Sequence, residues 1–143
     1  MRKSNLLTTV AITAALAISC TSAAAPAAVG AKGGTVNATL TDMKVAVDRT
    51  TVSAGPVTFV VKNSGAVVHE LVVIQTDVSQ DKLAVNMDEA GKMDETGNVG
   101  ETGDMAIGES KSFTVTLPAG HYVLMCNEIG HYSSGMHMAF TVN

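Results

Sequence analysis

Three side chains that can bind a metal follow one another at five-residue intervals near the C-terminus: the Cys126 thiol, the His131 imidazole and the Met136 thioether. The surrounding sequence predicts a strand that ends at Cys126, a Gly-containing loop that carries His131, and a strand that begins at Met136. Such a loop can fold back so that the three side chains face one point. His69 opens another predicted strand, and in a sandwich of strands we expect it to lie beside the end of the Cys126 strand.

Two imidazoles, one thiolate and a weak thioether form the trigonal ligand set, with a long axial bond, that suits copper. The sulfurs stabilise Cu(I) and the imidazoles keep Cu(II) bound. Zinc usually takes a fourth strong ligand or keeps an open site, and thioether ligation argues against zinc. We therefore predict one bound copper ion, with His69, Cys126, His131 and Met136 as its ligands.

At these residues the chain resembles the cupredoxins, the family of small blue copper proteins that includes plastocyanin and azurin. The resemblance rests on His69 after Asn63 and Gly65, on the run GHYVLMC at 120–126, and on the Cys-x4-His-x4-Met spacing, which is similar to that of sulfocyanin-like bacterial members. It covers nearly all of residues 35–143. It implies a Greek-key sandwich of about eight strands and a mononuclear type 1 copper site with the four ligands named above.

One position departs from the family pattern. Many cupredoxins have Asn directly after the first His ligand, where it ties the two ligand loops together, and this chain has Glu70. We expect Asn127 to take over part of that role. Changes around metal ligands tune the affinity and the potential more than they decide whether the metal binds.

Short β-rich runs separated by Gly and Pro turns predict the rest of the fold. They lie at residues 36–47, 57–61, 69–76, 111–117, 121–126 and 136–142. This pattern predicts an all-β protein built as an antiparallel sandwich of two sheets. Alternation along the strands turns His121 and His137 away from the ligands and places Met125 inside the sandwich. Tyr132 is expected at the surface near the copper.

Residues 77–104 interrupt the strands with eight acidic residues and two lysines. Ser79 can cap a short helix that ends at Gly91, and the Gly-rich stretch beyond it is typical of a mobile loop. A solvated insertion is the simpler interpretation, and a docking surface is the alternative. Without residues 1–19 the chain carries seven Lys/Arg and thirteen Asp/Glu, so its net charge of −6 resides in this segment.

The N-terminus predicts export. Arg2 and Lys3 precede an apolar stretch, and Cys20 follows small and apolar residues in a pattern that resembles a bacterial lipobox. We expect residues 1–19 to be a signal peptide, Cys20 to be lipidated, residues 20–34 to be a flexible tether and residues 35–143 to be the cupredoxin domain. The alternative is an ordinary cleavage further along, near residues 23–25.

The composition excludes several classes of protein. The nine basic residues are scattered, which disfavours nucleic-acid binding, and two cysteines cannot build a disulfide framework. We expect a monomeric electron carrier, not an enzyme on its own, that is attached to a membrane in the periplasm and passes single electrons between a redox donor and an acceptor. The alternative is a periplasmic copper-handling protein for storage, delivery or resistance that uses the same ligands.

Overall fold

The computed structural model describes residues 32–143, so the predicted signal peptide and the lipidation of Cys20 lie outside the described residues. Nine strands and one short 3-10 turn, η1, make up the described chain, which confirms the all-β class. Their bounds are β1 Gly34–Thr41, β2 Lys44–Val47, β3 Thr51–Val52, β4 Gly55–Asn63, β5 Val72–Gln75, β6 Asn98–Glu101, β7 Ser110–Leu117, β8 Gly120–Met125, η1 Tyr132–Ser134 and β9 His137–Val142.

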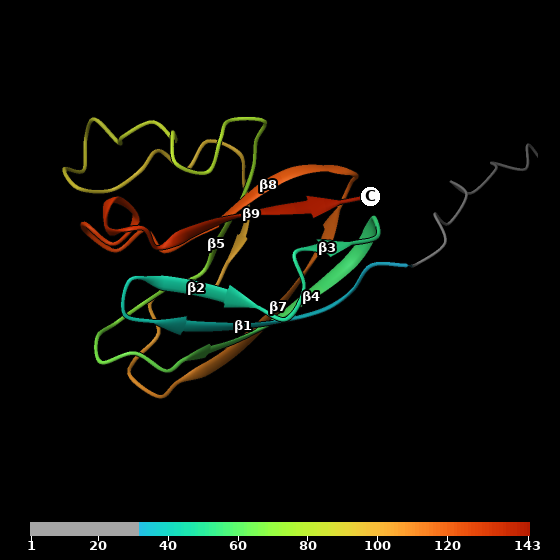
Figure 1. The fold of residues 1–143 in the computed structure, drawn as a ribbon, viewed down its shortest axis with the longest axis horizontal. Helices are drawn as coiled ribbons and strands as arrows, with labels where there is room; N and C mark the ends of the chain where they lie inside the picture. The colour runs from blue at the N-terminus through green and yellow to red at the C-terminus, as the bar shows by residue number, and fades with distance from the viewer. Residues whose placement is uncertain (1–31) are drawn as a thin grey trace, which may run out of the picture.

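The strands form two sheets that pack face to face (Figure 1), one with the order β2-β1-β4-β7 and the other with the order β3-β9-β8-β5-β6. The predicted sandwich is confirmed, with the difference that both sheets are mixed. β1 runs parallel to β4, and β3 runs parallel to β9. The reason is topological: after β1 and β2 the chain crosses to the other sheet at β3 and then returns as β4 beside β1, and a crossover of this kind makes parallel neighbours.

The core between the sheets is built from alternating strand residues. In β4, Val57, Phe59 and Val61 are fully buried, while their neighbours face outward. Phe59 stacks on Phe113 of β7 with ring centroids 5.2 Å apart. Burying side chains of this size stabilises a fold by roughly 1.5–3 kcal/mol each. The result is a rigid frame that fixes the strand ends where the candidate ligands lie.

A second apolar cluster covers the outer face of the sheet that contains β5 and β8. Met125 belongs to this cluster, so the prediction that it packs inside the sandwich is wrong. The alternation itself holds, but the Cys126 side of the strand, which includes Leu124, faces the core between the sheets, so Met125 faces the other side. Tyr132 is also buried here, which corrects its expected place at the surface. The buried members are Val72, Ile74, Met93, Val123, Met125 and Tyr132.

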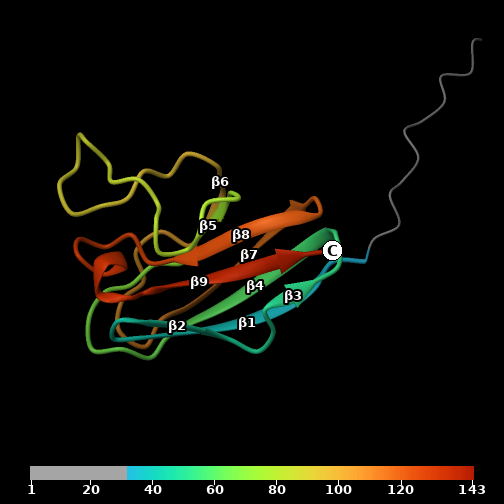
Figure 2. The same cartoon turned by 45° about the horizontal axis from the view of Figure 1, so that its top comes forward.

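The acidic segment covers this second cluster, as its yellow-green trace above the sheet shows in Figure 2. The predicted helix after Ser79 does not form. The Leu83 N–H, which a helix would pair with a carbonyl one turn earlier, donates to the Tyr132 hydroxyl at 3.0 Å instead. The predicted mobile loop is also wrong in part, because its Gly-rich end forms β6 and pairs with β5. Gly100 suits this strand, since a Cβ there would lie 3.0 Å from the Phe113 ring.

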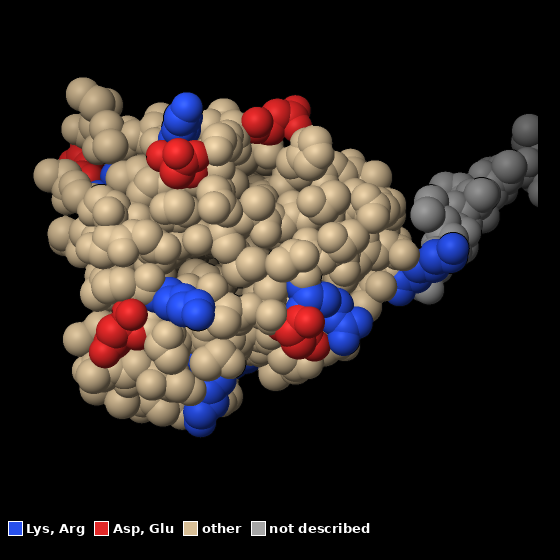
Figure 3. All heavy atoms as spheres, in the orientation of Figure 1, with Lys and Arg blue, Asp and Glu red and all other residues tan. Residues whose placement is uncertain are grey.

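On the face shown in Figure 3, Lys and Arg side chains lie singly or beside a carboxylate, and that face has no basic cluster. Within residues 32–143, no helix is long and apolar enough to cross a membrane.

Candidate metal centre

Three of the four predicted ligands meet at one end of the sandwich. The His69 Nδ1 lies 3.2 Å from the His131 Nδ1 and 3.8 Å from the Cys126 Sγ, and the Cys126 Sγ lies 3.4 Å from the His131 Nδ1. Within residues 32–143, these three form a cluster of side chains that can hold a metal ion. The sequence predicted that His69 lies beside Cys126, which is 57 positions away, and the structure agrees.

The spacing of these atoms fits a bound metal ion. A triangle with sides of 3.2, 3.4 and 3.8 Å has a centre about 2.0 Å from each corner, close to the roughly 2.0–2.1 Å metal–nitrogen and 2.3 Å metal–thiolate distances of protein zinc sites. Two imidazoles and a thiolate in a trigonal arrangement are the donor set that favours copper. The geometry therefore fits a copper ion bound by these three residues.

The loop between β8 and β9 is shaped by its own backbone hydrogen bonds. The His131 N–H donates to the Glu128 carbonyl at 2.9 Å, and the turn η1 that follows ends at Gly135, which has a left-handed φ of 99°. The Met136 N–H donates to the His131 carbonyl at 3.1 Å, while the Cys126 N–H donates to the Met136 carbonyl at 3.0 Å. The backbone of Met136 is thus bonded to both ligands, and its side chain is fully buried. Its role as the axial ligand stays a prediction.

Burial differs among the candidate ligands. His69 and Cys126 are fully buried, whereas His131 is half-buried. Burial raises the pKa of the Cys126 thiol to about 11, although backbone N–H groups of Glu70 and Glu128 act in the opposite direction. A metal ion displaces the thiol proton when it binds, so copper binding and proton release are coupled. Burial, followed by the nearby His69, lowers the pKa of His131.

Glu70 contributes to the site through its backbone. Its N–H donates to the Cys126 Sγ at 3.4 Å, which links the His69 end of the site to the thiolate. Its side chain is only 7% exposed. Burial, together with the charges of Glu95 and Glu128, raises the pKa of its carboxyl to about 7.

Asn127 makes a different link from the one expected. Its Oδ1 accepts the Met93 N–H at 2.7 Å, and its Nδ2 donates to the Met93 carbonyl at 3.1 Å and to the Glu95 Oε1 at 2.7 Å. These bonds tie the end of the Cys126 strand to the acidic segment and not to the His69 loop. Asn127, the residue after Cys126, therefore holds the acidic segment over the second apolar cluster.

Two residues near His69 have contacts that the sequence did not reveal. Asn63 is fully buried, and its Nδ2 donates to the carbonyls of Val67 and Met105, both at 2.9 Å. The position of Asn63 before His69 is part of the family resemblance, but the sequence does not indicate these hydrogen bonds. Asp42 lies in the turn between β1 and β2, and its Oδ1 is 3.1 Å from the His69 Nε2. A hydrogen bond from Ala66 and then one from His69 lower the pKa of Asp42.

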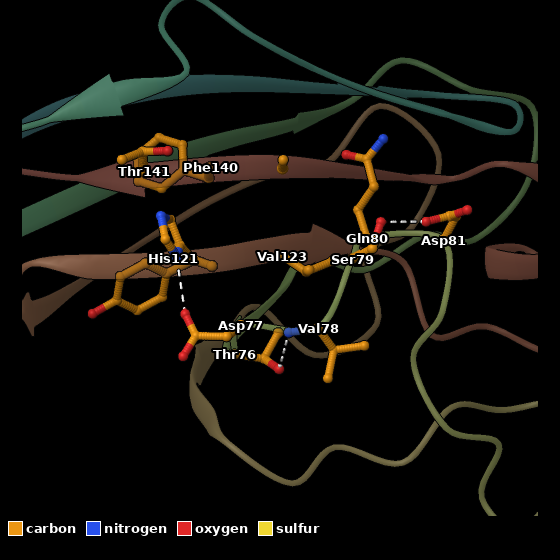
Figure 4. A pocket seen from close by; sticks show the side chains of 12 residues that line it. Thr76, Asp77, Val78, Ser79, Gln80, Asp81, His121, Val123, Phe140 and Thr141 are labelled. Atoms are coloured by element: carbon orange, nitrogen blue, oxygen red, sulfur yellow. Dashed lines mark hydrogen bonds and ion pairs between the residues drawn. The ribbon is translucent and has the colours of Figure 1, made fainter.

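The remaining histidines lie away from the ligands. His121 is on the outer face, where it pairs with Asp77 at 2.9 Å in the wall of a cavity of about 600 Å³ (Figure 4). Both side chains are strongly exposed, and this cavity contains none of the four predicted ligands. His137 packs on the Tyr132 ring with centroids 4.5 Å apart.

Comparisons with known proteins agree with this geometry. The chain is similar to auracyanin from the photosynthetic bacterium Roseiflexus castenholzii, with 24% identity over 80% of this chain and 99% of that chain, and a TM-score of 0.59. Rusticyanin from Thiobacillus ferrooxidans shares 20% identity over 78% of this chain and 79% of that chain, with a TM-score of 0.53. An azurin from Methylomonas sp. strain J shares 18% identity over 76% and 97%, with a TM-score of 0.55. At these identities the likeness shows the fold alone.

A search of curated protein sequences found no match. The family model for copper binding proteins of the plastocyanin/azurin family matches residues 32–143, which are the whole of the described chain. The match includes the strand ends and the loop that bring the two imidazoles and the thiolate together. The chain therefore belongs to the plastocyanin/azurin family of copper-binding proteins, the cupredoxins, which bind one type 1 copper.

Proposed function

We propose that the protein carries single electrons between redox partners outside the cytoplasm. The observation that carries this proposal is the triangle of His69, Cys126 and His131 donor atoms, whose centre fits a copper ion. When bound there, copper supplies a one-electron change between Cu(I) and Cu(II). Met136 is proposed as the weak axial ligand.

The residues around the triangle support electron transfer by keeping it rigid. The backbone bonds of Met136 to Cys126 and to His131 tie the two ends of the loop together, which limits its movement during electron transfer. The Glu70 N–H points the positive end of its dipole at the Cys126 sulfur. His131 is half-buried and lies on a surface loop, so its ring offers electrons a short path to a docked partner.

The rival function is copper storage or delivery with the same ligands. Ready transfer of copper requires that an acceptor reach the ligands, as in an open surface site. Here His69, Cys126 and Met136 are fully buried, and only His131 is partly exposed. This burial favours a resident copper ion over one that is handed on.

The test is the visible spectrum of the copper-loaded protein, with Cys126→Ser as the variant. We expect an intense thiolate-to-Cu(II) band in the wild type and its loss in the variant, because serine cannot supply the sulfur. His121→Ala is the matched control, since this exposed residue lies away from the ligands, and it should keep the band. A wild type without the band, or a variant that keeps it, would refute the site. Fast electron self-exchange with slow copper exchange would support the carrier over the delivery protein.

We also propose that the exported protein is attached to a membrane through lipid on Cys20. The support is the charged start, the apolar stretch and the position of Cys20 in the sequence. Two or three acyl chains would give stable anchoring where one would not. We expect the wild type in the membrane fraction and Cys20→Ala either soluble or unprocessed. A soluble wild type with an N-terminus beyond residue 20 would contradict the anchor.

A further inference from the structure

The β1–β2 turn lies against the buried ligand His69, although nearly thirty residues separate them in sequence. The Asp42 Oδ1 is 3.1 Å from the His69 Nε2, the ring nitrogen opposite the one that faces the ligand triangle. The same oxygen accepts the Ala66 N–H at 2.9 Å, so two donors hold the carboxylate in place. His69 itself is fully buried, which means that its Nε2 depends on a protein partner.

Two further features fit a close approach of this turn to the imidazole. A Cβ on Gly65 would collide with the Asp42 Oδ1 and would lie 2.6 Å from the His69 Nε2, so the contact requires glycine at that position. Gly65 has no left-handed φ, so what glycine provides here is space, not conformational freedom. On the turn itself, Met43 adopts a left-handed φ of 62°, which a non-glycine residue does at a cost. The tight two-residue turn thus carries Asp42, and the space left by Gly65 admits its carboxylate to the imidazole.

We infer that Asp42 is a positioning residue for the copper site: its carboxylate accepts the His69 Nε2–H, fixes the proton on that nitrogen, and leaves the Nδ1 lone pair facing the metal. This inference rests on the proposed copper function. A metal-ligating histidine commonly donates its other ring N–H to a carboxylate or carbonyl, which sets its tautomer and raises its basicity as a ligand. The partly exposed negative charge of Asp42 also favours Cu(II) over Cu(I).

The expected size of the effect on copper binding follows from other hydrogen-bond partners of metal-ligating histidines. Removing them typically costs 10- to 100-fold in metal affinity. If Asp42→Ala weakens Cu(II) binding by that factor and leaves Cu(I) binding unchanged, the reduction potential rises by about 60 to 120 mV, at 59 mV per tenfold for one electron. Asp42→Asn keeps an oxygen acceptor and loses the charge, so we expect a smaller rise.

The experiment has two independent readouts. In the copper-free protein labelled with ¹⁵N, ring nitrogen shifts report the tautomer of His69: we expect the Nε2–H form in the wild type and a mixture with the Nδ1–H form in Asp42→Ala. In the copper-loaded protein, voltammetry and Cu(II) competition measure the potential and the affinity. Asp48→Ala is the matched control, because Asp48 follows the other strand of the same hairpin and bonds to Asn37 and Arg49.

The outcomes separate this inference from the proposed function. A wild type that forms no blue copper site would refute the function. A blue wild type with the Nδ1–H tautomer, or an Asp42→Ala variant whose tautomer, affinity and potential equal those of Asp48→Ala, would overturn the role of Asp42 alone. A tautomer change together with a raised potential in Asp42→Ala, absent from Asp48→Ala, is the expected result.

Discussion

Asn127→Ala should loosen the acidic segment without removing the copper site. The Asn127 side chain is the hydrogen-bond partner of both backbone groups of Met93, and Asn127 and Met93 are only 2% and 5% exposed. Alanine leaves one buried N–H and one buried carbonyl without their partner. Each unsatisfied group costs roughly 1–3 kcal/mol, and because water can reach a surface segment once it opens, we expect about 2–3 kcal/mol in total.

We expect the lost stability to appear as local opening of the acidic segment. A tenfold change in an equilibrium takes about 1.4 kcal/mol, so amide exchange in residues 83–101 should accelerate by about 30- to 150-fold. The Asp94 N–H, which bonds to the Ala84 carbonyl, is a suitable probe. Amides between β4 and β7, which belong to the other sheet, should keep the protection of the wild type.

The assay is hydrogen exchange followed by mass spectrometry, with Asn37→Ala as the control. Asn37 also bonds through its side chain, but it bonds to Asp48 at an exposed position, so its removal should leave residues 83–101 unaffected. The visible spectrum of the copper-loaded Asn127→Ala protein should be unchanged. Unaltered exchange in residues 83–101, or equal acceleration in both sheets, would refute the view that Asn127 anchors the acidic segment as a separate unit.

Two further outcomes are expected. Met136→Leu should keep copper bound and raise the reduction potential, because the axial sulfur that helps to hold Cu(II) is lost. Each tenfold increase in the preference for Cu(I) over Cu(II) raises the potential by about 60 mV. An unshifted potential in voltammetry would favour Met138 as the axial ligand. Exchanging the exposed Asp88 and Glu89 for Asn and Gln should slow electron transfer to a basic partner by up to about tenfold at low ionic strength. The rate should also depend less on salt, because charge steering is screened over roughly 8 Å at physiological salt. Identical stopped-flow rates and salt slopes in wild type and variant would identify the segment as inert.

The sequence was sufficient for the frame and for the cluster of His69, Cys126 and His131 because both follow from simple rules of strand pattern and spacing. Alternation in β4 and β7 predicts strands with one buried face, and the spacing of Cys126, His131 and Met136 predicts a loop that returns to its start. The expected sandwich then placed His69, at a strand start, beside the end of the Cys126 strand, the family resemblance implied the same ligand, and the 3.2–3.8 Å distances agree with this. The parallel pairs β1–β4 and β3–β9 could not be predicted from the alternation of buried and exposed residues, because they depend on where the chain crosses between the sheets.

The errors occurred where long-range contacts override local preference. The spacing of Leu83, Met87 and Ala90 fits a helix, yet the Tyr132 hydroxyl takes the Leu83 N–H from 49 residues away. Asn86 then accepts the N–H groups of Asp88 and Glu89 with its side chain, which stabilises a turn in place of the helix. Local propensity contains no information about such partners.

The contacts of the acidic segment change how its charge can be interpreted. The segment lies against the ligand loop, where the Gly130 N–H donates to the Gly91 carbonyl at 3.0 Å (Figure 1), and the Tyr132 hydroxyl donates to the Gln80 carbonyl. If the negative charge of the segment draws a partner, that partner docks close to His131, the half-buried candidate ligand.

The four carboxylates at positions 88, 89, 94 and 95 fall into two groups. Glu95 accepts from Asn127 and Asn98, and the Asp94 carboxylate accepts from Thr96, so replacing these two would disturb structure as well as charge. The Asp88 carboxylate has no such bond among the described residues, and Glu89 has only an exposed ion pair with Lys92. Since an exposed ion pair contributes little to stability, substitution of these two changes mainly the field. A change in electron-transfer rate in that double variant, with amide exchange unaltered, would separate steering of a partner from support of the copper loop.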